Sequence, residues 1–177
     1  FTALTTISGT INAALSASVY AMDGISGNVT AGTGATVVAL DGPISGNVSA
    51  GGTLSEFART NISGSASAGG DASVTAFGNI SSPVSAGQDA FVSVGGSTTA
   101  SVSAGRDLSL SAIGGINGPV SAGRDAFVAS FGSVTGSVGA GRDASLFAGG
   151  ATSGSVSAGG DVQLFAGGGS SSIVMAG

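Results

Sequence analysis

The chain lacks four residue types that carry much of protein chemistry. None of its 177 residues is Cys, His, Lys or Trp. Without Cys it has no disulfides and no thiolate metal ligands, and without His or Cys the commonest general base and the strongest nucleophile are missing. Serine is abundant, but no base stands beside it in the sequence. We therefore expect no enzyme activity, no catalytic residue and no organic cofactor.

Positive charge is also scarce. Four arginines and nine acidic residues give a net charge of −5, and no basic run exists, so nucleic-acid binding is not expected. No apolar stretch approaches the roughly 20 residues of a membrane span, so no membrane span is expected. The chain opens at Phe1, inside the repeat pattern and without a signal peptide or initiator Met. We interpret it as a fragment or a processed subunit.

Glycine, at 34 of 177 residues, is instead plentiful, and it stands in a fixed repeat. Apolar residues make up 42% of the chain and are strictly placed, unlike those of disordered low-complexity sequence. An Ala-Gly step recurs with a period of about 18 residues, and only the interval between Ala31 and Ala50 is one residue longer. Its alanines define position zero of each unit: Ala31, Ala50, Ala68, Ala86, Ala104, Ala122, Ala140, Ala158 and Ala176, with Ala13 preceding them in phase. This spacing predicts a solenoid with one unit per coil.

Within each unit, apolar and polar residues alternate. Val, Leu, Ile or Ala occupy positions −2, +4, +6, +8 and often +12, with polar residues between them, as in the stretch LSLSA at 108–112. Period two predicts strands, and the Gly-rich segments between them predict corners. The sequence thus predicts one all-β domain over 1–177, a parallel β-solenoid (β-helix) of about ten coils with three short strands per coil.

Two further features of the coil follow from the spacing. A left-handed hexapeptide helix needs an aliphatic residue at every sixth place, whereas this chain has Val at −2, mostly Ala at +4 and Gly near +10. We therefore expect the right-handed sense usual for parallel crossovers. The extra residue of the one longer interval is expected in the corner at 40–44, because corners tolerate insertions best.

One inward position is out of pattern. Glu56 stands at +6, where the other units carry Val or Leu. A buried carboxylate without a partner is costly. We expect either that this coil bulges and turns Glu56 outward, or that Arg59 or a bound ion satisfies the carboxylate.

A carboxylate recurs at position +3, and carboxylates stacked one coil apart repel one another. One interpretation is a calcium ladder of the nonapeptide-repeat type, although each unit has a single Asp and calcium takes six or more oxygens. The interpretation we prefer is a corner in which the carboxylate accepts backbone N–H groups, with Arg106, Arg124 and Arg142 spacing the charge. The column comprises Asp71, Asp89, Asp107, Asp125, Asp143 and Asp161.

Phenylalanine stands at odd positions, hence on the outward face of one strand. Phe77 and Phe131 stand at +9. The alternative to a shared role is that the rings are scattered and exposed, or that the two at +9 fold around the corner into the core. The aromatic rings interrupt the flat Thr-rich face that ice binding needs, so the sequence argues against that class. Five residues are predicted to form a lateral interface with another rod or a flanking segment: Phe57, Phe91, Phe127, Phe147 and Phe165.

The stretches SAGRDLSL (103–110) and SAGGDVQL (157–164) resemble the repeats of filamentous-haemagglutinin-type adhesins, large secreted bacterial surface proteins with a right-handed β-helical shaft. The resemblance covers nearly the whole chain, most clearly residues 62–166. The repeat here is shorter and poorer in Asn than is usual in that family. The resemblance implies an extracellular or cell-surface location and roles in attachment and biofilm formation.

The leading hypothesis is therefore a structural subunit of an extracellular bacterial fibre or adhesin shaft that forms a homopolymer. Phe1 fits position +6, Gly177 fits position +1, and neither end carries a polar cap. Subunits are accordingly predicted to stack head to tail through Phe1, Ile7, Val174 and Gly177. The alternative is a module that binds glycans or a host surface along one face of the rod.

Overall fold

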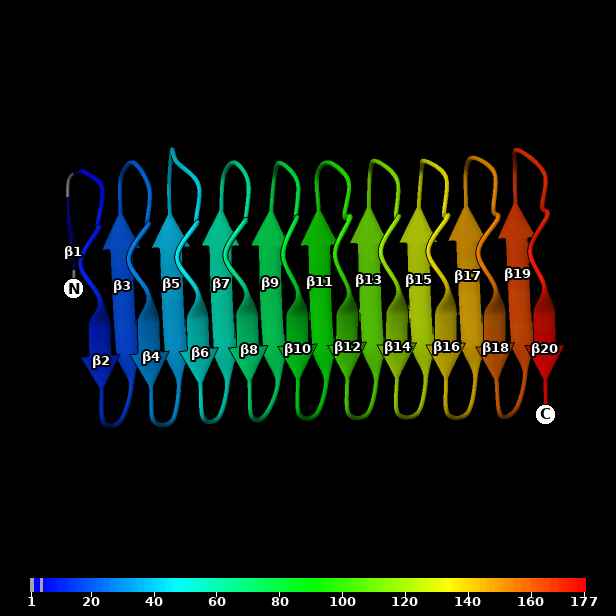
Figure 1. Ribbon diagram of the computed structural model, residues 1–177, viewed down its shortest axis with the longest axis horizontal. Helices are drawn as coiled ribbons and strands as arrows, with labels where there is room; N and C mark the ends of the chain where they lie inside the picture. Colours follow the sequence, from blue (N-terminus) through cyan, green and yellow to red (C-terminus); the bar gives the residue numbers. More distant parts are fainter. Residues whose placement is uncertain (1, 4) are drawn as a thin grey trace.

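The chain folds as an all-β parallel solenoid of about ten turns (Figure 1). The structure is a computed structural model that describes residues 2–3 and 5–177. It confirms the predicted fold class, while the hand of the coil stays a prediction. The described residues contain no helix, and hence none able to cross a bilayer.

Two parallel sheets of ten strands form the walls of the solenoid and run in opposite directions within each coil (Figure 1). Nine strands of the first sheet have five residues each, because alternation lasts longest between positions +4 and +8. This long-strand sheet comprises β1 (Thr2–Ala3), β3 (Ala17–Ala21), β5 (Ala35–Ala39), β7 (Leu54–Ala58), β9 (Ala72–Ala76), β11 (Ala90–Val94), β13 (Leu108–Ala112), β15 (Ala126–Ser130), β17 (Ala144–Ala148) and β19 (Val162–Ala166).

The strands of the second sheet have three residues each and span positions −2 to 0. This short-strand sheet comprises β2 (Ile11–Ala13), β4 (Val29–Ala31), β6 (Val48–Ala50), β8 (Ala66–Ala68), β10 (Val84–Ala86), β12 (Val102–Ala104), β14 (Val120–Ala122), β16 (Val138–Ala140), β18 (Val156–Ala158) and β20 (Val174–Ala176).

The third predicted strand is reduced to one bridging residue per coil, at position +12. Ile44 bridges to Ile62, Ile62 to Ile80, and the column continues in parallel from Ile7 to Ser170. Glycine and short polar residues flank the bridging residue, as in the stretch GGING at 114–118. They offer few side chains to pack, so pairing does not extend beyond the one apolar residue.

The register shows where the extra residue of the longer interval lies. Ala21 pairs with Ala39, whereas Ile25 bridges to Ile44, and the second of these intervals is one residue longer than the first. The next bridge, from Ile44 to Ile62, returns to the shorter interval. The extra residue therefore lies in the corner between Ala39 and Ile44, and the sheets on either side keep their alignment.

The core is a set of stacked columns of small and β-branched side chains. Most of the largest apolar ones belong to the bridging side, where Ile25, Ile44, Ile62, Ile80 and Ile116 are fully buried, and the long-strand sheet adds Leu110 and Leu146. Each fully buried aliphatic side chain of this size contributes roughly 1.5–3 kcal/mol. A single coil contributes only a few of them, so the fold depends on contacts between neighbouring coils.

Glycine at position +1 is required by close approach of the stacked corners. A β-carbon at Gly105 would lie 2.2 Å from the carbonyl oxygen of Gly87, and one at Gly123 would lie 2.1 Å from that of Gly105. Among the described residues only Gly169 has a positive φ, 96°. The glycines of this column therefore serve the stacking of one coil on the next rather than an unusual backbone conformation.

Candidate functional site

The outer face of the long-strand sheet carries the main surface features. Positions +4, +6 and +8 of each strand point into the core, which leaves +5 and +7 outward. Four of the five phenylalanines predicted for a lateral interface are exposed, and the fifth, Phe57, is half-buried. Their place on the outward face agrees with the sequence pattern, and their role in an interface stays a prediction.

Phe77 and Phe131 do not fold into the core. Their side chains are 59% and 82% exposed, so the alternative that turned them around the corner is wrong. The ring of Phe77 instead packs edge-on against Phe57, with centroids 5.5 Å apart. Phe127 and Phe147 form a second ring pair at 5.8 Å. These aromatic side chains thus form two separate ring pairs on the sheet face.

Several of these side chains enclose a groove of about 540 Å³ along the C-terminal ends of the long strands. We call it the aromatic groove; its walls are Phe77, Ile113, Phe131, Phe147 and Phe165, and its floor consists of small residues between Ala76 and Gly149. Ile113, which is not among the residues predicted for the interface, is 64% exposed. Ile113 stands at +9, the position of Phe77 and Phe131, so the repeat pattern indicates that it shares their surface.

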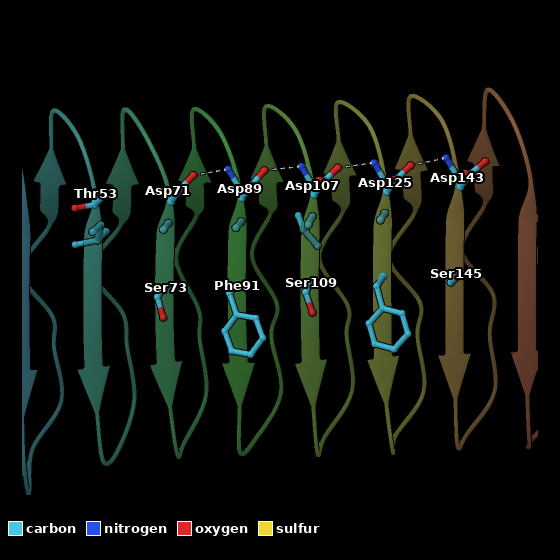
Figure 2. Close-up of a pocket in the computed structure, with 16 residues that line it drawn as sticks. Thr53, Asp71, Ser73, Asp89, Phe91, Asp107, Ser109, Asp125, Asp143 and Ser145 are labelled. Carbon is cyan, nitrogen blue, oxygen red and sulfur yellow. Dashed lines mark hydrogen bonds between the residues drawn. The ribbon is translucent and has the colours of Figure 1, made fainter.

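A second groove, of about 860 Å³, follows the N-terminal ends of the same strands (Figure 2). Figure 2 shows the aspartates along one edge, with Phe91 on the strand between those of Ser73 and Ser109. Phe127, on β15, lines the same groove. We call it the acidic groove. It combines hydrogen-bond acceptors with two aromatic faces.

The Asp column forms a ladder of hydrogen bonds between coils (Figure 2). The backbone N–H of Asp89 donates to Oδ1 of Asp71 at 3.1 Å, and that of Asp161 donates to Oδ1 of Asp143 at 2.9 Å. The intervening aspartates repeat the pattern. The preferred interpretation is therefore confirmed in that the carboxylates accept backbone N–H groups, although the donor belongs to the next coil rather than to the same corner.

Arginine pairs with this ladder across coils. Arg106 donates from Nε to Oδ1 of Asp89 at 3.1 Å and from Nη2 to Oδ2 at 2.7 Å. Arg124 holds Asp107 in the same two-pronged way, and Arg142 holds Asp125.

These arginine hydrogen bonds lower the pKa of the Asp107 and Asp125 carboxyl groups and raise the pKa of the Arg124 and Arg142 guanidinium groups. Within residues 2–3 and 5–177, no three acidic side chains converge as metal ligands would. Calcium binding by the column is the untested alternative to the corner interpretation.

Glu56 occupies the core, which overturns the first expectation for it. It pairs in register with Val37 on one side and Val74 on the other, and only 2% of its surface is exposed. Arg59 does not reach it, because its Nη1 bonds Oδ1 of Asp41 at 3.3 Å. Neither Glu56 carboxyl oxygen has a hydrogen-bond partner.

Burial without a partner raises the pKa of Glu56 from 4.5 to about 8. The side chain is therefore mostly protonated and uncharged at neutral pH. A neutral carboxylic acid costs far less to bury than a carboxylate, which is how the coil keeps its regular register at this position.

The predicted axial residues lie at the two ends. Phe1 lies outside the described residues. Ile7 is buried on the bridging side, and its N–H donates to the Gly24 carbonyl at 2.9 Å. Val174, by contrast, is 48% exposed, although it belongs to the same column that buries Val156. The N–H of Gly177 donates to the Ala158 carbonyl at 3.2 Å.

No protein-family model, curated protein or solved structure matches the chain. The similarity to filamentous-haemagglutinin-type adhesins therefore depends on the repeat residues alone. The structure supports the coarser part of that resemblance, a parallel β-solenoid of about ten turns.

Proposed function

We propose that the chain is a structural segment of a rod, the shaft of an extracellular fibre or adhesin. The observation that carries this proposal is the unbroken register. Each long strand pairs in parallel with the next from β1 to β19, and each short strand from β2 to β20. Such a molecule has length, a uniform cross-section and a repeated surface. The extracellular setting follows from the adhesin resemblance of residues 103–110 and 157–164.

Axial association is the second part of the proposal. The outermost strands β1, β2, β19 and β20 each have a neighbour on one side only, so their outer backbone groups are available to another strand. Leu164 and Val174 occupy core columns but keep part of their surface in water. In the assembled rod these edges are covered by further coils, either of the same polypeptide or of the next copy. A contact of this kind is heterologous and extends into a filament.

Electron microscopy of the purified protein tests this proposal. We expect filaments in which the coil spacing of ~4.8 Å continues across subunit boundaries in diffraction. Val174→Asp places a charge on the exposed end column and should shorten or abolish the filaments. The matched control, Ser157→Asp, puts the same charge on an outward position of β18 and should leave them intact. Filaments that grow equally well from both variants would refute the axial contact.

Glycan binding is a second candidate function, and the acidic groove favours it. Phe91 and Phe127 belong to β11 and β15, two coils and about 9.6 Å apart at the usual strand spacing, and Ser109 belongs to β13 between them. Aromatic rings stack on sugar faces, and carboxylates accept hydrogen bonds from hydroxyl groups. A glycan array supports this candidate if a signal for one glycan disappears with F91A and F127A. No signal for any glycan would eliminate it.

A further inference from the structure

We propose that the aromatic groove binds the same face of a second copy of this chain, so that rods associate side by side. This inference rests on the proposed rod function and names the surface used for lateral association. It adds Phe77, Ile113 and Phe131 to the residues that the sequence pattern assigned to the interface.

The exposed apolar area of the groove is at the upper end of what a monomer leaves in water. Its four phenylalanines, Phe77, Phe131, Phe147 and Phe165, leave between 41% and 82% of their surface exposed. At roughly 150–250 Å² per side chain, they expose on the order of 500 Å² of apolar surface, to which Ile113 adds. The largest apolar patch of a typical monomer is about 300–600 Å², and a standard protein–protein interface buries about 800 Å² per partner.

The distribution of charge favours a partner with the same surface. Between residues 72 and 166, charged side chains occur only at positions +2 and +3 of each coil, at the Asp edge. The lining of the aromatic groove contains no charged residue. Two copies can therefore meet over this groove without removing a charge from water.

The shape of the face is suited to self-association. Phe131 and Ile113 project from the surface, while the groove floor beside them consists of residues as small as Gly95 and Ala112. Projecting and hollow parts thus occur on one patch. A twofold-related pair of copies uses the same patch twice, so each copy can insert its projecting side chains into the groove of the other.

The first test compares two surface variants by sedimentation velocity and by the width of rods in electron micrographs. F131S combined with F147S removes two groove walls without altering a buried side chain. The control, Leu15→Ser, removes a 71% exposed apolar residue that does not line the groove. We expect the double variant to weaken lateral association by roughly 10- to 100-fold, the effect of one or two interface hot spots. The control should associate like the original protein.

The second test uses the absence of cysteine. Ser111→Cys introduces a single thiol within the groove, and Ser85→Cys introduces one on the outer face of the short-strand sheet. Maleimide should label Ser111→Cys quickly in dilute protein and slowly in concentrated protein, and should label Ser85→Cys at the same rate in both. Equal labelling of the groove thiol at both concentrations would overturn the proposal.

The lateral and axial contacts are separable in these experiments. Val174→Asp should prevent lengthening but still give paired short rods, whereas the double Phe variant should still lengthen as single rods. Raising the salt concentration should strengthen pairing, because it screens the repulsion between copies of net charge −5. Long rods of single width at every protein and salt concentration would overturn the lateral inference and leave the rod proposal standing.

Discussion

Glu56 gives the sharpest prediction, because burial raises the pKa of its carboxyl group to about 8. The chain has no His, Cys or Lys, its other eight acidic residues are aspartates, and Glu56 is its one glutamate. Replacing Glu56 with Val restores the pattern of its column, in which Val37 and Val74 are its register partners. Glu56→Gln is the matched control, because it keeps the shape and polarity and removes only the ionisation.

The size of the stability change follows from the pKa of the buried Glu56 carboxyl group. It rises from 4.5 to about 8 on folding, so the folded state holds more protons than the unfolded state between these values. The stabilisation due to the neutral acid is fully present below pH 4.5 and is lost as the pH rises through 8. At about 1.4 kcal/mol per pKa unit, the free energy of unfolding falls by about 5 kcal/mol over this window, of which about 3 kcal/mol is lost by pH 7.

The pH dependence of stability that Glu56 causes is opposite in sign to the one that the aspartates at the corners cause. Their arginine partners lower the pKa of Asp107 and Asp125, so their contribution is lost only when the pH falls below the ordinary range for Asp. We therefore attribute the change of stability with pH between pH 5 and pH 8 to Glu56. We expect the original protein to lose stability with rising pH, and the Val and Gln variants to show no slope.

Hydrogen exchange followed by mass spectrometry is the appropriate assay, since repeat arrays need not unfold in one step and exchange reports local opening. After correction for the intrinsic pH dependence of exchange, amides of β5, β7 and β9 should lose protection with rising pH in the original protein only. At pH 7 the Val variant should be more stable by about 3 kcal/mol or more. Equal slopes in the original protein and Glu56→Gln, or a Val variant that is less stable at pH 7, would refute the reasoning.

Three further changes test the packing. Gly105→Ala places a β-carbon against the carbonyl of the preceding coil and should cost about 1–3 kcal/mol of unfolding free energy, measured by denaturant titration; full stability would contradict the close-approach argument. Ala66 is the one alanine in the −2 column, and its strand, β8, contacts β7, which holds Glu56. If Ala66 leaves room for the longer carboxylic side chain, Ala66→Val should destabilise the original protein but not Glu56→Val. Ser130→Ala removes the 2.6 Å hydrogen bond from Oγ to the Gly114 carbonyl and should cost about 1 kcal/mol. Finally, a chelator should leave thermal stability unchanged, whereas a drop in Tm would assign calcium to the Asp column.

The repeat period by itself determined the fold class and the identity of the core. A constant period forces like residues to stack, and strict alternation assigns each side chain to the inside or the outside. The same argument located the insertion near 40–44 and placed Phe91 and Phe127 on the outer face. These features depend only on order along the chain, which is why the sequence was sufficient for them.

The features that depend on what lies one coil away needed the tertiary structure. Glu56 stays buried because its column holds it in register with Val37 and Val74, and Arg59 is diverted to Asp41. The carboxylates bond to the coil that follows, and Phe77, Ile113 and Phe131 jointly border a groove. The sequence shows which residues share a column. Their hydrogen-bond partners, their burial and the shape of the surface are decided only when neighbouring coils stack about 5 Å apart.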